Sequence, residues 1–358
     1  MHELLPILEE KFEVVRFSDE PGCYPIHNLN EIDLKEPFDY SLTFNEDRKS
    51  GIYFRFATLA LPGVLVLADA NFDRLYFSLH WQFTDLSKKP ILTQMIENAS
   101  SIAVLNDHAL SNVRNLKLDE SKSLFGIQVP VRQRSSAEER MINQDSLKTD
   151  FCLAYSARYL NEEKSHEVIE TLLELKRSGV PAKLLWLTRK TEIESIRSFL
   201  DIEAQRHMTD IQEQVELVVV ENFVAERETL CRADVFLSLR KDFLHSPPTA
   251  FYHALALGVP TVASEIGPMM AVPKSSLLFV PAGAGEEQGI FTAIRSIYEN
   301  MELRRELSEQ SRKYASLVHD PKIVASDLLQ ILEYDRKENP DIFEKTRRRH
   351  KELEAAIC

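Results

Sequence analysis

The chain has 358 residues, which is too long for one ordinary hydrophobic core and fits two domains of about 150 to 200 residues each. Its net charge of −13 argues against general nucleic-acid binding, because neutralising phosphates needs a basic face. Its longest apolar runs, such as Leu59–Leu67, are too short to span a bilayer, and its acidic start is unlike a signal peptide. We therefore expect a cytoplasmic protein of two domains that does not bind nucleic acid.

The cysteines carry no recognisable pattern. They lie far apart and form no CxxC pair (Cys23, Cys152, Cys231 and Cys358). This spacing indicates neither a disulfide framework nor a zinc site, so we expect reduced thiols.

The first part of the chain alternates predicted helices and strands. Met1–Phe12 has the pattern of a helix, and three apolar segments predict strands: Tyr40–Phe44, Gly63–Leu67 and Ile102–Leu105. A continuous apolar run such as Gly63–Leu67 is typical of a buried parallel strand. Apolar residues become scarce over Arg132–Thr149, so we place an interdomain linker there.

The second part repeats the alternation with stronger signals. Apolar runs predict strands over Phe151–Tyr155, Ala182–Thr188 and Val215–Val220. Helical spacing appears over Lys164–Ser178 and near Glu226–Arg232. Strands that alternate with helices predict an α/β fold with a parallel sheet.

The most informative segment is Ala233–Pro273. Asp234–Leu239 is an apolar run rich in β-formers, Thr249–Leu257 has helical spacing, and Gly258-Val259-Pro260 ends that helix before the strand Thr261–Ser264. This is a strand, helix and strand of a parallel sheet. Ligands bind such sheets outside the carboxyl ends of the strands, so we expect a ligand at the loop after Leu239.

This segment resembles the nucleotide-sugar site of GT-B glycosyltransferases of the retaining kind, the glycosyl transferases group 1 family. The resemblance extends from about Pro37 to Glu333. It implies GT-B architecture, in which two doubly wound Rossmann-like domains face each other across a cleft. The implied divisions are an acceptor-side domain over 1–133, a nucleotide-sugar-binding domain over 134–338, and a helix over 339–358 that crosses back to the first domain.

The resemblance also assigns donor-binding residues. The segment SARYLNEEKS resembles the loop that carries an arginine and a lysine to the donor diphosphate, which gives Arg158 and Lys164. A guanidinium binds phosphate bidentately and an ammonium acts as a mobile point charge, so both suit a departing nucleoside diphosphate. Without the resemblance, the pair reads as a solvated loop beside Glu162 and Glu163.

The donor loop itself keeps Arg240 but departs from the family pattern. Two family glutamates, one near the sugar and one accepting the ribose hydroxyls, correspond here to His245 and His253, and in a closer subgroup the loop glutamate corresponds to Ser246. An imidazole still accepts a hydrogen bond, but it supplies no fixed negative charge. Pro247 and Pro248 stiffen the loop, and we expect the following helix to begin at Thr249 or Ala250. The donor-binding set is Arg158, Lys164, Arg240, His245, Ser246, Thr249 and His253.

In the first domain the resemblance points to two acceptor-side residues. Asn45 matches an asparagine at the end of a strand, and Asp69 follows Pro62-Gly63 and an apolar strand, although Ala68 replaces the family histidine. Asp69 reads equally well as the N-cap of the next helix, and Asn45 as the end of its strand. The family's first strand and glycine-rich loop have no counterpart, which implies either a shortened homologue or a decayed nucleotide site.

The implied function is transfer of a hexosyl group from a nucleotide-diphosphate sugar, of UDP or GDP type, to a glycan, lipid-linked or protein acceptor in polysaccharide or glycoconjugate synthesis. No metal or other cofactor is implied. The alternative is an inactive glycosyltransferase-like protein that serves as a scaffold for an active partner transferase. The basic run Arg347–Lys351 reads as a solvated helix face or as a weak peripheral contact with anionic lipid or a partner.

Overall fold

The computed structural model describes residues 4–12, 42–45, 63–67, 99–106, 110–111, 114, 122–144, 150–156, 164–209, 211–241, 247–283 and 285–341. These residues divide into two compact units. The first unit takes the described residues up to Pro130 and those from Pro321 onward, and the second takes those from Val131 to Asp320. No described helix is long and apolar enough to cross a membrane.

The first unit is built on parallel strands. Its described strands are β1 (Leu42–Asn45), β2 (Val64–Leu67), β3 (Ser101–Val104) and β4 (Ser123–Gly126), which pair in that order. The first three match the sequence predictions to within two residues. β4 was not predicted, because only two of its four residues, Leu124 and Phe125, are large and apolar.

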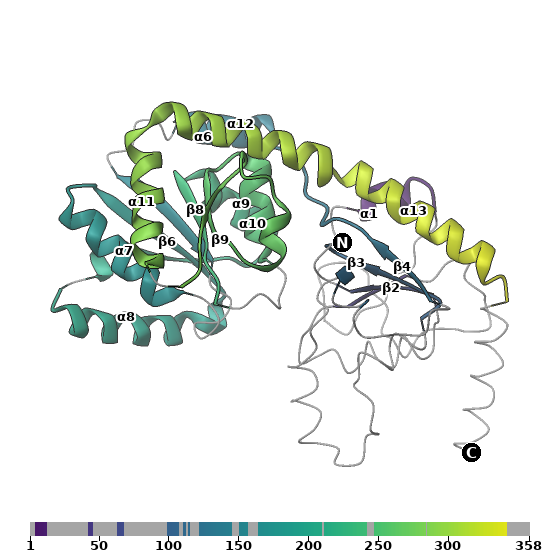
Figure 1. Ribbon diagram of the computed structural model, residues 1–358, viewed down its shortest axis with the longest axis horizontal. Coiled ribbons are helices and arrows are strands. Elements are labelled where there is room, and N and C mark those ends of the chain that lie inside the picture. The colour runs from purple at the N-terminus through teal and green to yellow at the C-terminus, as the bar shows by residue number, and fades with distance from the viewer. Residues whose placement is uncertain are drawn as a thin grey trace, which may run out of the picture. The chain divides into compact units, whose positions relative to one another are not determined.

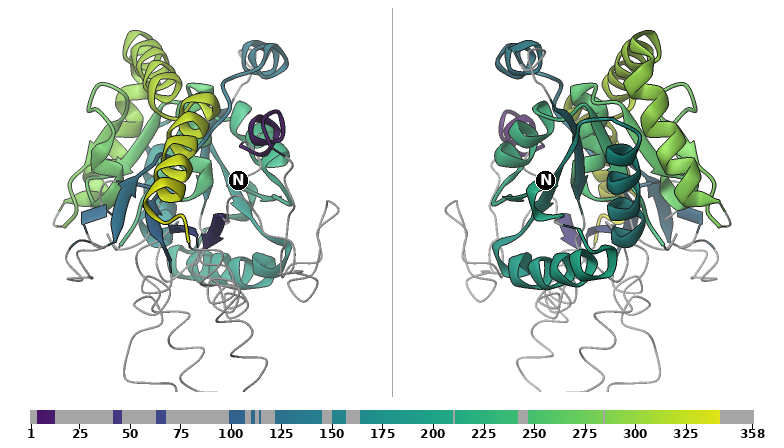
Figure 2. Two further views of the ribbon diagram at one scale, coloured as in Figure 1. Left: turned by 90° about the vertical axis from the view of Figure 1, so that its right-hand side faces the viewer. Right: turned by 90° about the vertical axis from the view of Figure 1, so that its left-hand side faces the viewer.

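Two of the described helices pack against this sheet. Helices α1 (Leu5–Glu9) and α13 (Pro321–Glu338) bury apolar residues in one cluster with the strands, and the left view of Figure 2 shows the yellow α13 running beside them. Asp335 of α13 accepts hydrogen bonds from the hydroxyls of Ser100, at 2.7 Å, and Ser101, at 2.6 Å. Helix α13 ends at Glu338, and of the returning helix expected over 339–358 only residues 339–341 are described, so that expectation stays a prediction.

The second unit holds a six-stranded parallel sheet in the order β10-β9-β8-β5-β6-β7 (Figure 1). Read from the other edge and numbered along the chain, this is the order 3-2-1-4-5-6 of a doubly wound dinucleotide-type sheet. The strands are β5 (Phe151–Ser156), β6 (Ala182–Thr188), β7 (Val215–Val219), β8 (Val235–Ser238), β9 (Thr261–Ser264) and β10 (Leu278–Val280). The parallel α/β fold predicted from the sequence is confirmed.

Helices lie on both faces of this sheet. α7 packs beside α11, and α9 packs beside α10. The helices are α6 (Ser136–Gln144), α7 (Ser165–Arg177), α8 (Ile193–His207), α9 (Phe223–Cys231), α10 (Thr249–Leu257), α11 (Glu286–Glu299) and α12 (Met301–Val318). α10 begins at Thr249, as the two preceding prolines predict.

Helix α6 lies within Arg132–Thr149, where we expected the interdomain linker. Its start is a capping box: Glu138 N–H donates to the Ser135 hydroxyl at 3.3 Å, and Ser135 N–H donates to the Glu138 carboxylate at 2.8 Å. The Ser-x-x-Glu spacing was present in the sequence. Scarce apolar residues concealed the helix, because α6 buries little besides Glu138.

Burial also accounts for the thiols that the structure describes. Cys152 and Cys231 are buried thiols. Burial raises the pKa of Cys231 to about 11, so its thiol stays protonated at neutral pH.

Gly258 ends α10 in the left-handed conformation, with φ of 77°. A Cβ added there would lie 2.8 Å from Arg312 side-chain carbons and from the Ser308 hydroxyl. We expect Gly258→Ala to lower the free energy of unfolding by about 3 to 4 kcal/mol, from backbone strain and overpacking together. Urea denaturation measures this loss.

Gly179→Ala is the matched control for this substitution. Gly179 has a similar φ of 82°, but a Cβ there would meet nothing within 4 Å. The control therefore carries the backbone strain alone, about 1 to 2 kcal/mol. Equal losses in the two variants would show that the contact with Arg312 costs nothing.

Candidate functional site

The strand order of the second unit defines where a ligand belongs. From β5 the chain adds β6 and β7 on one side, and it then returns to add β8, β9 and β10 on the other side. The order of the strands therefore reverses between β5 and β8. In doubly wound sheets, ligands bind outside the carboxyl ends of the strands at this switch point. Two of the predicted donor residues flank it: Lys164 precedes α7, which follows β5, and Arg240 follows β8. The Lys164 backbone N–H lies 3.4 Å from the Leu239 carbonyl oxygen, which joins the two segments.

Lys164 is not the solvated loop residue that the sequence also allowed. Its side chain is only 7% exposed, and its ammonium forms an ion pair with the carboxylate of Glu286, the first residue of α11. Glu286 is itself 9% exposed, and it also accepts a hydrogen bond from the Gly283 N–H at 3.3 Å. The pair is buried because α7 and α11 pack side by side on one face of the sheet.

The surroundings of Lys164 favour anions. Lys164 occupies the N-cap position of α7, so its ammonium lies at the positive end of a helix of 13 residues. On the other side of the switch point, Arg240 is buried, and its backbone N–H donates to the Ser264 hydroxyl at 3.0 Å. Two cationic side chains and a helix N-terminus thus lie at the carboxyl edge of the sheet.

A second group of polar residues joins α9 and α10. His253 is buried, and its Nδ1 lies 2.6 Å from Oε1 of Glu226, a residue in the first turn of α9. The Thr249 hydroxyl donates to the other oxygen of the same carboxylate at 3.3 Å. In the neutral tautomer whose Nδ1 donates to Glu226, Nε2 is a hydrogen-bond acceptor. The His253 position, expected to lack a fixed negative charge, therefore has a carboxylate beside it.

The α9 helix that carries Glu226 is anchored by a buried ion pair. Arg227 is fully buried, and its Nε donates to Glu138 at 2.7 Å while its Nη1 donates to the Arg132 carbonyl at 3.1 Å. Burial by itself raises the pKa of Glu138. Hydrogen bonds from Arg227 and from the Ser135 N–H, with the Arg227 charge, outweigh burial and lower that pKa to about 2. Glu138 is therefore ionised at neutral pH.

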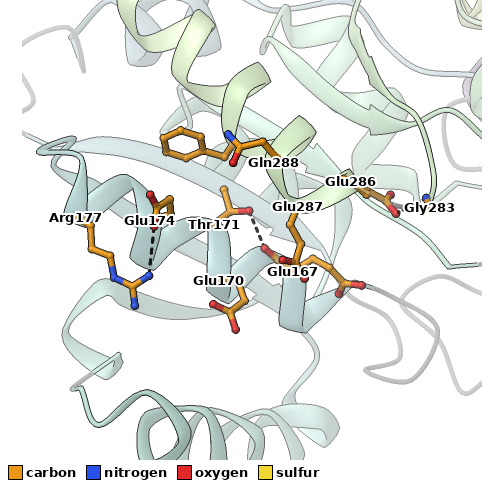
Figure 3. A pocket seen from close by; sticks show the side chains of 11 residues that line it. Glu167, Glu170, Thr171, Glu174, Arg177, Gly283, Glu286, Glu287 and Gln288 are labelled. Carbon is orange, nitrogen blue, oxygen red and sulfur yellow. Dashed lines mark hydrogen bonds and ion pairs between the residues drawn. The ribbon is translucent and has the colours of Figure 1, made fainter.

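A pocket beside this edge has a different character. It encloses about 510 Å³ between α7 and α11, and Figure 3 shows Glu170, Glu174 and Arg177 of α7 on one side and Gln288 of α11 on the other. Five of its lining residues are glutamates: Glu167, Glu170, Glu174, Glu286 and Glu287. Carboxylates repel a diphosphate, and neither Arg240 nor His253 lines this pocket, so we do not place the donor in it.

The remaining predicted site residues are not placed. Arg158, His245, Ser246 and Asp69 lie outside the described residues, and Asn45 is described only as the last residue of β1. The structure brings Thr249 and His253 together through Glu226, and it sets Lys164 and Arg240 on either side of the switch point.

Two residues of this site, Glu226 and Glu286, were missed in the sequence. Glu226 opens the helix predicted over Glu226–Arg232, and an acidic first turn at a sheet edge was the available signal. Glu286 follows the glycines Gly283 and Gly285, which mark a turn into a helix. Neither signal identifies the partner, because the partners are 27 and 122 residues away.

No protein-family model matches the sequence, and no curated protein matches it. Among solved structures, the chain is similar to HepE from Anabaena, in complex with UDP and glucose, with a TM-score of 0.62 and 13% identity over 82% of this chain and 78% of HepE. It is also similar to WaaG, a glycosyltransferase involved in lipopolysaccharide biosynthesis, with a TM-score of 0.60 and 13% identity over 91% of this chain and 93% of WaaG.

A third similar structure is the sucrose-phosphate synthase from Thermosynechococcus elongatus, with a TM-score of 0.57 and 14% identity over 76% of this chain and 73% of that enzyme. Identities this low establish the fold alone. The chain has the GT-B fold, built from two Rossmann-like domains, which confirms the predicted fold class.

Proposed function

We propose that this protein is a glycosyltransferase that moves a hexosyl group from a nucleotide-diphosphate sugar to a glycan, lipid-linked or protein acceptor in polysaccharide or glycoconjugate synthesis. One observation carries the proposal: Lys164 and Arg240 flank the switch point of a doubly wound sheet in a chain with the GT-B fold. Similar structures determined in complex with UDP and a sugar, among them HepE, add support.

In this proposal the cationic edge binds the diphosphate. Lys164, the N-terminus of α7 and Arg158 stabilise the negative charge that grows on the departing nucleoside diphosphate. Positive side chains in this place do the work that a divalent cation does elsewhere, so we propose transfer without a metal. We also propose retention of the sugar's configuration, with the acceptor hydroxyl approaching the face that the diphosphate leaves.

The pair of Glu226 and His253 binds the ribose in this proposal. A diol needs hydrogen-bond acceptors, and the carboxylate of Glu226 together with Nε2 of His253 supplies them. The carboxylate absent from the donor loop is thereby provided by the neighbouring helix α9. Asn45 and Asp69 are proposed on the acceptor side of the first domain, on the resemblance alone.

Calorimetric titration with UDP, GDP and ADP tests the proposal, followed by assays of transfer and of donor hydrolysis. We expect one nucleoside diphosphate to bind in preference and its sugar conjugate to be turned over. A protein that binds none of the three would instead be the inactive scaffold, and its effect on a partner transferase would be assayed next.

We expect Glu226→Gln to weaken nucleoside diphosphate binding by about 1.5 kcal/mol, roughly tenfold, because it removes a charged acceptor of ribose hydroxyls. Pyrophosphate has no ribose, so its affinity should stay unchanged. Glu228→Gln is the matched control, since Glu228 lies on the same helix and is exposed. An equal loss for pyrophosphate would mean that the substitution disturbs the site as a whole.

A further inference from the structure

The ion pair between Lys164 and Glu286 raises a problem for diphosphate binding. Both side chains are more than nine-tenths buried, and they come from helices at opposite ends of the domain sequence. Of the two carboxylate oxygens of Glu286, Oε2 accepts from Lys164 and from the Gly283 N–H. The Oε1 atom is buried and has no hydrogen-bond partner among the residues that the structure describes. The lysine expected to meet the phosphate is therefore already neutralised.

We propose that Glu286 occupies the place of the donor diphosphate at Lys164 in the free protein, so that it competes with nucleoside diphosphates and sets how tightly they are held. This inference rests on the proposed function. Glu286 lowers the affinity for nucleoside diphosphates, whereas the cationic side chains of the site raise it.

Electrostatics decides the direction of the effect. A diphosphate in contact with Lys164 would lie within roughly 5 Å of the Glu286 carboxylate, and two like charges at this distance repel each other strongly even at an effective dielectric constant of about 20. Glu167 and Glu287 line the pocket that Glu286 also lines, so they add negative charge on the same side. These carboxylates therefore oppose the binding of an anion. Glu286 opposes it most, because its carboxylate is in contact with Lys164.

The arrangement favours release of the product. Lys164 passes from the departing diphosphate back to Glu286, so its charge never remains buried without a partner. The ammonium of a lysine has three N–H donors, so a small rotation is enough for one hydrogen bond to change its acceptor from phosphate to carboxylate. Glu286 thus shortens the time for which a nucleoside diphosphate stays bound.

Glu286→Gln separates charge from shape, because the amide keeps the volume of the side chain and an oxygen for the Gly283 N–H. Glu287→Gln is the matched control: Glu287 is the next residue of the same helix, it lines the same pocket, and it does not pair with Lys164. Glu286→Asp is the second variant, which keeps the charge but withdraws it from Lys164.

The experiment titrates pyrophosphate, UDP and GDP into the full chain and its three variants. We expect Glu286→Gln to bind pyrophosphate and the preferred nucleoside diphosphate roughly tenfold more tightly with slower dissociation, Glu286→Asp to show a smaller gain, and Glu287→Gln to match the wild type within about twofold. Pyrophosphate should also raise the melting temperature of Glu286→Gln more than that of the wild type.

The outcomes separate this inference from the proposed function. Equal or weaker binding of every anion by Glu286→Gln would overturn the competition, even if the wild type binds UDP. Tighter pyrophosphate binding by Glu286→Gln without binding of any nucleoside diphosphate would support the competition and contradict the proposed function. If Glu286→Gln does not fold, a Glu286→Asp affinity no higher than that of the wild type overturns the inference.

Discussion

Arg227→Met is expected to lower the free energy of unfolding by about 3 to 5 kcal/mol, because it removes the fully buried cationic partner of Glu138 and leaves the carboxylate paired with Arg132, whose side chain is 40% exposed. It also leaves two carbonyl oxygens, of Arg132 and Gln133, without their donor. Denaturation with guanidinium chloride measures the loss.

Arg232→Met is the matched control. Arg232 also pairs with a glutamate, Glu216, but its side chain is 42% exposed, and exposed ion pairs contribute less than about 1 kcal/mol. Replacing both Arg227 and Glu138 by apolar residues should restore part of the loss. Similar losses for the two arginine variants would refute the role of burial.

The pH dependence of the free energy of unfolding is an independent test of the ion pair between Arg227 and Glu138. The pKa of Glu138 is lowered in the folded protein from 4.5 to about 2, so its contribution is fully present above pH 4.5 and is lost as the pH falls through about 2. The stability difference between the wild type and Arg227→Met should therefore shrink over this window. A constant difference would mean that Glu138 is not the group that responds.

The double variant Lys164→Gln with Glu286→Gln is expected to lose transfer activity by about 10²- to 10³-fold, the scale of removing one preorganised charge from a transition state. Replacing Lys164 alone leaves the buried Glu286 carboxylate without the cation it pairs with, which destabilises the fold and confuses the result. The double variant removes both charges together and preserves volume. The initial rate at saturating donor, and the unfolding midpoint, are the measurements.

Lys183→Gln is the control for this experiment. Lys183 lies near the amino end of β6, where it pairs with Glu216, so a lysine of an ion pair is replaced by glutamine far along the strand from the carboxyl edge. We expect its activity to equal that of the wild type. If the double variant turns over as fast as the wild type, Lys164 has no role in the transfer reaction. If the wild type itself is inactive, the result favours the hypothesis of an inactive scaffold protein.

Much of the second unit was predictable because its signals are local. β6 and β9 have the predicted bounds, and α10 begins and ends where Pro248 and Gly258 require it. Each of these follows from a run of apolar residues or from a residue with a restricted backbone. α8 carries no such signal, since only three of its fifteen residues are buried.

The sequence by itself determined the parallel α/β fold and the edge of the sheet where a ligand belongs, because hydrophobic periodicity and helix-stop residues act within a few positions of each other. Only the tertiary structure decided that Lys164 is paired with Glu286 and His253 with Glu226. Those pairs depend on the strand order, which places α7 beside α11 and α9 beside α10. The spacing of residues along one strand or helix contains no information about which other helix lies next to it.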